Sequence, residues 1–287
     1  MIRKVLFMTL LLYACGCTAA NVGKEDKEIL RRFWRYAARE KLAEKGIAER
    51  VPVIARFFVG TPYASGTLEV AAEVTAEDLP VVNLRALDCV TFVENVLALA
   101  YLERYGNGAE QAFVDNLRKI RYRDGRIGGY ASRLHYSSDW LYEMGRQGLL
   151  TDVTKFAGGV PYGKRIGFMT KNADRYPVLK ASPAEKAQMK KVEEAINSRP
   201  YYYIPKHALR KACGRIREGD VVLITTTIKG LDTSHLGFAV KRDGKTYLLH
   251  ASSAGKHVML TAKPLDAYMA EIPSQSGIML GRARRGK

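Results

Sequence analysis

Residues 234–253 read SHLGFAVKRDGKTYLLHASS, two runs rich in apolar and β-branched side chains on either side of a short polar stretch. Asp243-Gly244 in that stretch is a strong signal for a two-residue hairpin turn, because both positions of such a turn need a positive φ. With these two residues in the turn, Arg242 lies opposite Lys245. The stretch therefore predicts an antiparallel hairpin of defined register.

The register of this hairpin brings two histidines together. His250 is expected opposite Gly237 and His235 opposite Ser252, so the two imidazoles share one face as diagonal neighbours. The glycine leaves room for the rings. Two histidines that meet by register are better explained as a base and its orienting partner than as incidental residues. The other face is apolar and is the core side if the helical layer packs elsewhere; it carries Leu236, Phe238, Val240, Tyr247 and Leu249.

Other segments with a period of two flank the hairpin, namely GDVVLITTT (219–227), HVMLTAK (257–263) and GIMLGRAR (277–284). Helical spacing of apolar residues dominates the first half of the chain, over 24–60, 88–100 and 109–120. Helices first and strands second predict an α+β fold, with a helical layer packed on a C-terminal antiparallel sheet. We expect one domain over 21–287, with a loop-rich insert at about 121–210.

The first twenty residues predict an export signal. Two cations precede an apolar run over residues 5–14, which is too short to span a bilayer but suits a secretory signal. Small residues follow, and they leave two outcomes open: cleavage after Ala20, or lipid attachment at Cys15 or Cys17. The protein is expected in the periplasm, either free or lipid-anchored to the outer membrane.

The net charge of the chain is +17. A basic surface suits an anionic partner such as cell-wall material. Nucleic acid is discounted, because an exported protein rarely meets it and the sequence contains no nucleic-acid-binding motif. We expect a monomer.

The stretch RALDCVTFVENVLALA (85–100) places a cysteine at the start of an apolar helix. Asp88 is expected to cap the first turn, and the aligned N–H dipoles there lower the pKa of the Cys89 thiol. A small buried residue is the simpler explanation for a lone cysteine. A disulfide with Cys213 is another, since an exported protein meets an oxidising compartment.

The two histidines favour catalysis. We predict Cys89 as nucleophile, His235 as general base and acid, and His250 as the residue that fixes the tautomer of His235. A zinc site is the rival explanation for one cysteine and two histidines, but the close-spaced ligand pairs typical of zinc are missing. No metal or cofactor is expected.

Five motifs occur in an order that resembles the NlpC/P60 papain-like cell-wall hydrolases: GTPYASG (60–66), LDCVTF (87–92), REGDVVLI (217–224), SHLGFAV (234–240) and LLHASS (248–253). The resemblance implies the same three catalytic residues and places Tyr63 beside the thiolate. The long insert and the segment SRLHYSSDW (132–140) are similar to the DUF1460 branch. That branch implies an N-acetylmuramoyl-L-alanine amidase acting on peptidoglycan fragments. The alternatives are a γ-D-glutamyl-diamino acid endopeptidase and a non-catalytic wall-binding module.

The segment SRLHYSSDW also supplies candidate contacts to a muropeptide substrate. Arg133, His135 and Asp139 are predicted to bind it, together with Ser234 and Tyr63, and an arginine there would suit a carboxylate. The alternative is structural: Asp139 caps a helix and Trp140 lies in the core.

Overall fold

The computed structural model describes residues 22–69 and 79–284. The expected signal segment, with both candidate lipidation sites, lies outside these residues. Within 22–69 and 79–284, no helix is both long and apolar enough to cross a bilayer.

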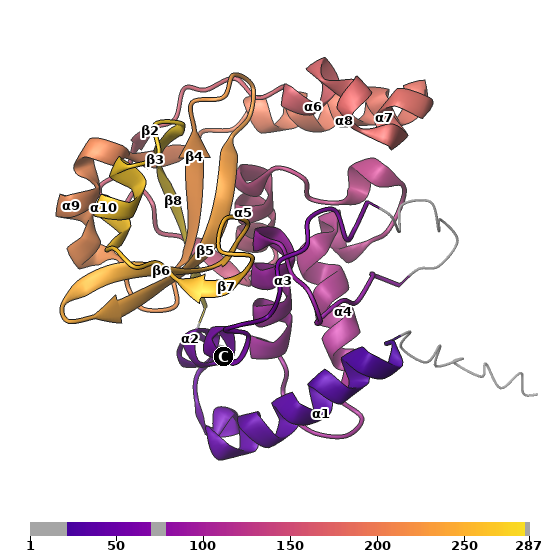
Figure 1. The fold of residues 1–287 in the computed structure, drawn as a ribbon. Helices are drawn as coiled ribbons and strands as arrows, with labels where there is room; N and C mark the ends of the chain where they lie inside the picture. Colours follow the sequence, from indigo (N-terminus) through magenta and orange to yellow (C-terminus); the bar gives the residue numbers. More distant parts are fainter. Residues whose placement is uncertain (1–21, 70–78, 285–287) are drawn as a thin grey trace, which may run out of the picture.

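A single antiparallel sheet forms the centre of the molecule (Figure 1), in the order β2-β3-β8-β4-β5-β6-β7, with β1 also paired to β8. The strands are β1 (Leu150–Asp152), β2 (Val160–Pro161), β3 (Tyr202–Pro205), β4 (Val221–Thr226), β5 (Thr233–Arg242), β6 (Lys245–Ser252), β7 (His257–Leu260) and β8 (Gln275–Ala283).

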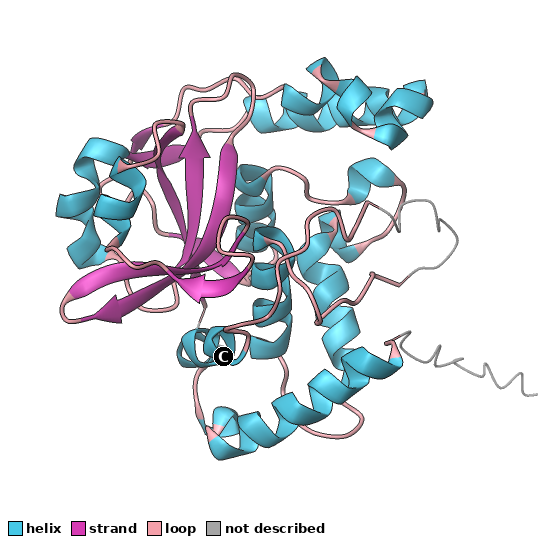
Figure 2. Cartoon of the chain, viewed as in Figure 1, coloured by secondary structure: helices cyan, strands magenta, loops and turns pink. Residues whose placement is uncertain are grey.

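Helices lie on both sides of this sheet and beyond one end of it (Figure 2). One group comprises α1 (Lys24–Arg39), α2 (Ile47–Phe57), α3 (Cys89–Ala100), α4 (Glu110–Arg121) and α5 (Ser137–Arg146). The short helices α9 (Leu209–Ala212) and α10 (Leu265–Ala270) cover the opposite face. A third group comprises α6 (Phe168–Lys171), α7 (Pro177–Ala181) and α8 (Pro183–Asn197). Single 3₁₀ turns occupy Leu42–Glu44, Arg123–Gly125, Tyr130–Ser132, Ala173–Arg175, Lys206–Ala208 and Cys213–Arg215. The α+β prediction is confirmed.

The predicted hairpin is confirmed in its register. Strands β5 and β6 pair with Arg242 opposite Lys245 and Phe238 opposite Leu249. Asp243 and Gly244 both have positive φ, 50° and 70°, as the predicted turn requires. Gly237 is also required, because a Cβ there would lie 2.6 Å from Leu249 O.

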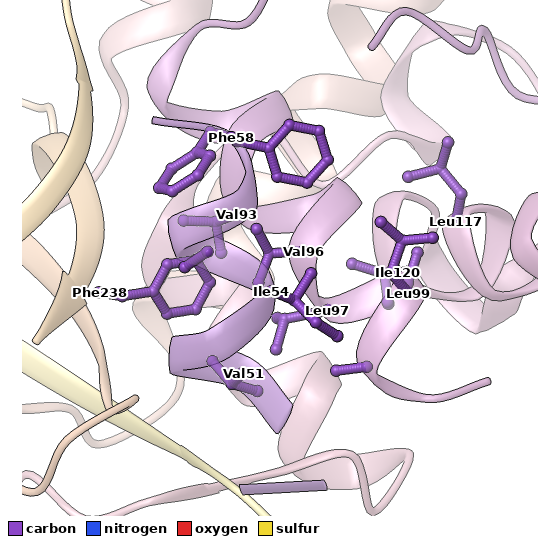
Figure 3. Packing of buried hydrophobic residues seen from close by; sticks show 14 of the residues in the cluster. Val51, Ile54, Phe58, Val93, Val96, Leu97, Leu99, Leu117, Ile120 and Phe238 are labelled. Carbon is purple, nitrogen blue, oxygen red and sulfur yellow. The ribbon is translucent and has the colours of Figure 1, made fainter. Parts of the chain in front are cut away.

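The apolar face of the hairpin packs on the helical layer. Phe238 contacts Phe92 of α3 edge to face, with ring centroids 5.5 Å apart, and Figure 3 shows Phe238 directed at α2 and α3. The sequence made this face the core side only on the condition that the helical layer packs elsewhere; the face is buried, and it is the helical layer that buries it. The reason is that the large apolar side chains of β5 lie on this face, and burying them against α3 removes the most apolar surface from water.

The segment 121–210 has more regular structure than a loop-rich insert would have, since it contains α5 to α8 and β1 to β3. Strand β3 pairs with β8 through Ile204 and Ile278. Because β8 is remote from β3 in the chain, the residues around β3 do not predict this pairing. The predicted helix over 24–60 is divided at Gly46, where α2 begins.

Candidate active site

Cys89 occupies the first turn of α3, as expected. Asp88 caps the helix: its carboxylate accepts a hydrogen bond from Thr91 N at 2.7 Å. Both Cys89 and Cys213 are free thiols, which excludes the disulfide between them.

The pKa of the Cys89 thiol is shifted upward, contrary to the sequence-based expectation. Burial, together with the adjacent Asp88 carboxylate, raises it to about 12. The backbone amides of Leu236, Cys89 and Val90 donate to the sulfur and act in the opposite direction. The helix N-terminus thus stabilises the thiolate as predicted, but desolvation is larger.

His235 and His250 lie against each other on the opposite face of the sheet from α3. His235 Nε2 and His250 Nδ1 are 2.6 Å apart, and the ring centroids are 4.8 Å apart. The predicted juxtaposition is confirmed. Burial lowers the pKa of His235 to about 4, and burial together with His235 lowers the pKa of His250 to about 3. Both rings are therefore neutral at pH 7.

The sulfur lies at the backbone amide of Leu236, the residue that follows His235. Odd-numbered residues of β5 hydrogen-bond to β4, as Ala239 N does to Asp220 O, so the amide of Leu236 points to the β6 side. The ladder between β5 and β6 extends only as far as Phe238 and Leu249. The Leu236 amide donates to Cys89 Sγ instead.

Cys89 Sγ thus contacts the backbone of Leu236, the residue that follows His235 in the chain. No hydrogen bond joins the sulfur to either imidazole within the part of the chain that the structure describes. His235 has its Nε2 engaged by His250, which leaves Nδ1 as the nitrogen that can receive the thiol proton.

Tyr63 adjoins the thiol. Its loop is held by hydrogen bonds from Tyr63 N to Lys256 O (2.8 Å) and from Ala64 N to Leu87 O (3.3 Å). Burial raises the pKa of Tyr63, and the nearby Cys89 and Asp88 raise it further. The phenol is therefore a neutral hydrogen-bond donor near the sulfur.

The segment 132–140 is arranged differently from the prediction. Arg133 is ion-paired with Glu69 and lies over the ring of Tyr130, 5.5 Å from its centroid. His135 Nε2 donates a hydrogen bond to Tyr130 O at 2.8 Å. Burial and the Arg133 charge hold the pKa of His135 well below its ordinary value. Both residues are engaged within the protein, so neither is a free group for substrate.

Asp139 and Trp140 are structural. Asp139 is 1% exposed and forms ion pairs with Arg123 at 2.5 Å and Arg199 at 2.6 Å. It caps no helix, since α5 has no side-chain cap. Trp140 lies in the core, as the alternative prediction had it, and its Nε1 donates to Ile120 O. Ser234 is exposed beside His235 and is accessible to a substrate.

Sequence reasoning missed a polar cavity of about 440 Å³ in the insert, lined in part by Tyr162, Lys164 and Arg165. The run PYGKR (161–165) combines turn-forming residues with cations, and that combination was the available signal. Among the described residues, no group of three or more histidines, cysteines or acids is placed to hold a metal ion, so the zinc alternative has no supporting geometry.

A family model described as AmiA-like, N-acetylmuramoyl-L-alanine amidase-like, matches residues 53–278. The chain belongs to the AmiA-like family. The matched region spans Cys89, His235 and His250. The prediction of an amidase-like hydrolase is therefore confirmed at the level of the family. A comparison with curated proteins gives no match.

Three solved structures place this AmiA-like chain among its neighbours. An N-acetylmuramoyl-L-alanine amidase from Bacteroides uniformis ATCC 8492 is 36% identical, with a TM-score of 0.76 over 83% of this chain and all of that one. A Bacteroides fragilis protein, provisionally described as a xylanase, is 39% identical, with a TM-score of 0.73 over 80% of this chain and 99% of that one.

The third is protein LPG0564 from Legionella pneumophila str. Philadelphia 1, described under DUF1460. It is 23% identical, with a TM-score of 0.64 over 90% of this chain and 94% of that one. At this identity the likeness concerns the fold alone, and it agrees with the DUF1460 resemblance seen in the sequence.

Proposed function

We propose that this protein is an exported cysteine amidase with a papain-like active site. It cleaves the amide between N-acetylmuramic acid, or its anhydro form, and L-alanine in peptidoglycan fragments. The observation that carries the proposal is the position of Cys89 Sγ at the Leu236 amide, next to a hydrogen-bonded His235–His250 pair. Family membership supports the bond type.

The neutral resting state defines the first step. Cys89 Sγ attacks the lactyl carbonyl carbon while its proton passes to His235 Nδ1, so the sulfur is never a free buried anion. The Cys89 and Val90 amides point at the sulfur side of the site and stabilise the oxyanion that forms. Tyr63 is placed to donate to the same oxygen.

The tetrahedral intermediate then collapses. His235 returns its proton to the nitrogen of L-alanine, the C–N bond breaks, and the stem peptide leaves with a free amino group. Water, deprotonated by His235, hydrolyses the thioester and restores the thiol. His250 keeps His235 oriented throughout through the 2.6 Å contact.

Mass spectrometry of defined muropeptides tests the proposal. Wild type is expected to release the whole stem, beginning with L-alanine, while Cys89→Ala and His235→Ala release none. A sugar that retains a dipeptide instead indicates the γ-D-glutamyl endopeptidase. Binding without cleavage by wild type indicates a wall-binding module and overturns the amidase.

Export and anchoring are a separate part of the proposal, supported by the N-terminal sequence. Cell fractionation of wild type, Cys15→Ser and Cys17→Ser is the test. A lipoprotein stays with the outer membrane until its modified cysteine is replaced, whereas a cleaved protein is found in the soluble periplasm in all three cases. Retention in the cytoplasm contradicts export.

A further inference from the structure

The polar cavity of the insert lies at the end of the sheet where β5 begins. Tyr162 donates its hydroxyl to Asp232 O at 2.8 Å, and Ser138 N donates to Asp232 Oδ2 at 2.7 Å. Lys164 donates to Thr226 O, at the end of β4. Asp232 lies behind the lining residues Tyr162 and Ser138 and precedes His235 by three residues. Because a strand rises about 3.3 Å per residue, these contacts lie about 10 Å along the chain from His235.

The insert builds the remainder of the cavity. Gly167 N and Phe168 N both donate to Gly230 O, at 3.0 Å, which joins the start of α6 to the loop between β4 and β5. Figure 1 shows α6 and α8 beside that loop. Asn197, at the end of α8, fixes the chain at Ile166 by donating to its carbonyl and accepting from its amide.

The cavity has an excess of positive charge at its open side. Three cations line it, namely Lys164, Arg165 and Arg199, and no acid does. Asp139 pairs with Arg199 from beneath. Asp232 is likewise buried, and burial raises its pKa, which disfavours its charged form. Arg165 is exposed and has no ion-pair partner among the described residues.

Two hydroxyl groups in this cavity have unsatisfied hydrogen-bonding capacity. The Ser138 and Tyr201 hydroxyls are buried and make no well-formed hydrogen bond within the described residues, although Ser138 lies near Asp232 and Tyr201 near Arg199. A buried polar atom without a partner costs free energy unless a ligand or water supplies one.

The geometry points to this cavity as a binding site for a carboxylate of the stem peptide, with Arg165 and Lys164 as the cations that bind it. The inference rests on the proposed function, because it takes the stem as the ligand. A carboxylate on the second or third residue of an extended stem lies about 7–10 Å from the scissile amide, which matches the distance from His235. Guanidinium donors suit a carboxylate better than a sugar hydroxyl.

The test measures binding to Cys89→Ala, which does not turn the substrate over. One probe is an N-acetylmuramoyl-tripeptide with free carboxylates, and the other is the same compound with its carboxylates converted to carboxamides. Arg165→Ala is expected to weaken binding of the free acid about tenfold and to leave binding of the amide unchanged. Arg175→Ala, an exposed cation of the same insert outside the cavity lining, is the control and changes neither.

The inference is overturned if Arg165→Ala binds the free acid as tightly as the Cys89→Ala protein that it was made from. It is also overturned if Arg165→Ala loses the same affinity for the free acid and for the carboxamide. Wild type is assayed for cleavage in parallel. If wild type cleaves the substrate but Arg165→Ala shows no loss of affinity specific to the free acid, the cavity assignment is wrong and the proposed amidase activity is retained. If Arg165→Ala loses affinity for the free acid alone but wild type does not cleave the substrate, the cavity assignment is supported and the proposed activity is wrong.

Discussion

At the scale of single residues, the candidate site combines a protonated thiol with two neutral imidazoles. Burial raises the pKa of Cys89 and lowers the pKa values of His235 and His250. A thiolate–imidazolium pair is therefore not the resting state. In the proposed mechanism, charge separates only as the substrate carbonyl accepts the electrons of the sulfur.

Asp88 has two separable effects on this thiol. Asp88→Asn keeps a capping side chain, so the free energy of unfolding is expected to stay within about 0.5 kcal/mol of wild type. It removes the charge that raises the pKa of Cys89, so the pH midpoint for alkylation of Cys89 falls. Asp88→Ala also loses the bond to Thr91 N and costs about 1 kcal/mol. Urea unfolding and iodoacetamide labelling measure the two effects; an unchanged labelling profile in Asp88→Asn contradicts the assignment.

The buried histidines predict a loss of stability in acid. Unfolded histidine has a pKa near 6.5, above the folded values of about 4 for His235 and about 3 for His250. Between pH 6.5 and about 4 the unfolded chain therefore binds protons that the folded chain does not, and stability falls as pH falls. Above pH 6.5 the contribution is complete. Each histidine accounts for roughly 1 kcal/mol per pH unit within that window.

Urea unfolding at pH 7.5, 6.5 and 5.5 measures this slope. The double variant His235→Asn, His250→Asn is expected to be flatter over the same range, whereas replacement of the surface residue His207 leaves the slope unaltered. Equal slopes for wild type and the double variant count against neutral, buried imidazoles.

At the scale of elements, the hairpin sets the geometry of the His235–His250 pair. Its tight turn fixes which residues of β5 and β6 are opposite, and Gly237 allows β6 to approach. A Cβ at this position would lie 2.9 Å from His250 Cβ as well as against the β6 backbone.

Gly237→Ala is accordingly expected to displace His250, cost about 1–3 kcal/mol of stability and reduce kcat more than it changes KM. Gly214→Ala is a matched control, because a Cβ there meets nothing within 4 Å. Muropeptide kinetics and urea unfolding are the measurements. Normal kcat in a Gly237→Ala variant would falsify the requirement for close strand approach.

The features of the elements that could be predicted from the sequence are those decided by residues close together in the chain. The Asp243-Gly244 turn and the Asp88 cap are decided by neighbouring residues, so the hairpin register and the start of α3 follow from the sequence. The partners of Arg133 and Asp139 are remote: Glu69 in one case, Arg123 and Arg199 in the other. From the sequence alone, Arg133 and Asp139 were therefore predicted to bind substrate, although in the fold each is already ion-paired. The cavity has the same origin, since its walls come from three separate segments of the chain.

At the scale of the whole molecule, Asp139 ties the insert to the helical layer. Arg123 follows α4 and Arg199 precedes β3, and both pair with this one buried carboxylate. Both pairs are largely buried on the carboxylate side, so their main effect is on the stability of the fold.

Asp139→Asn is expected to cost about 3 kcal/mol, toward the low end for breaking a buried ion pair, because both guanidinium groups keep some access to water. KM for muropeptides should not rise. Asp115→Asn, which breaks an exposed pair with Arg118, should cost at most about 0.5 kcal/mol. Urea unfolding and kinetics check both. A raised KM with unchanged stability would restore the substrate contact predicted from the sequence.

The protonated state of the half-buried Cys89 thiol bears on how long the protein survives. Peroxide and disulfide exchange attack thiolates, and a sulfur kept protonated inside the fold offers them almost none. Such a protein should keep its reactive atom reduced during long exposure to air, and simple alkylating reagents at neutral pH should underreport its competence.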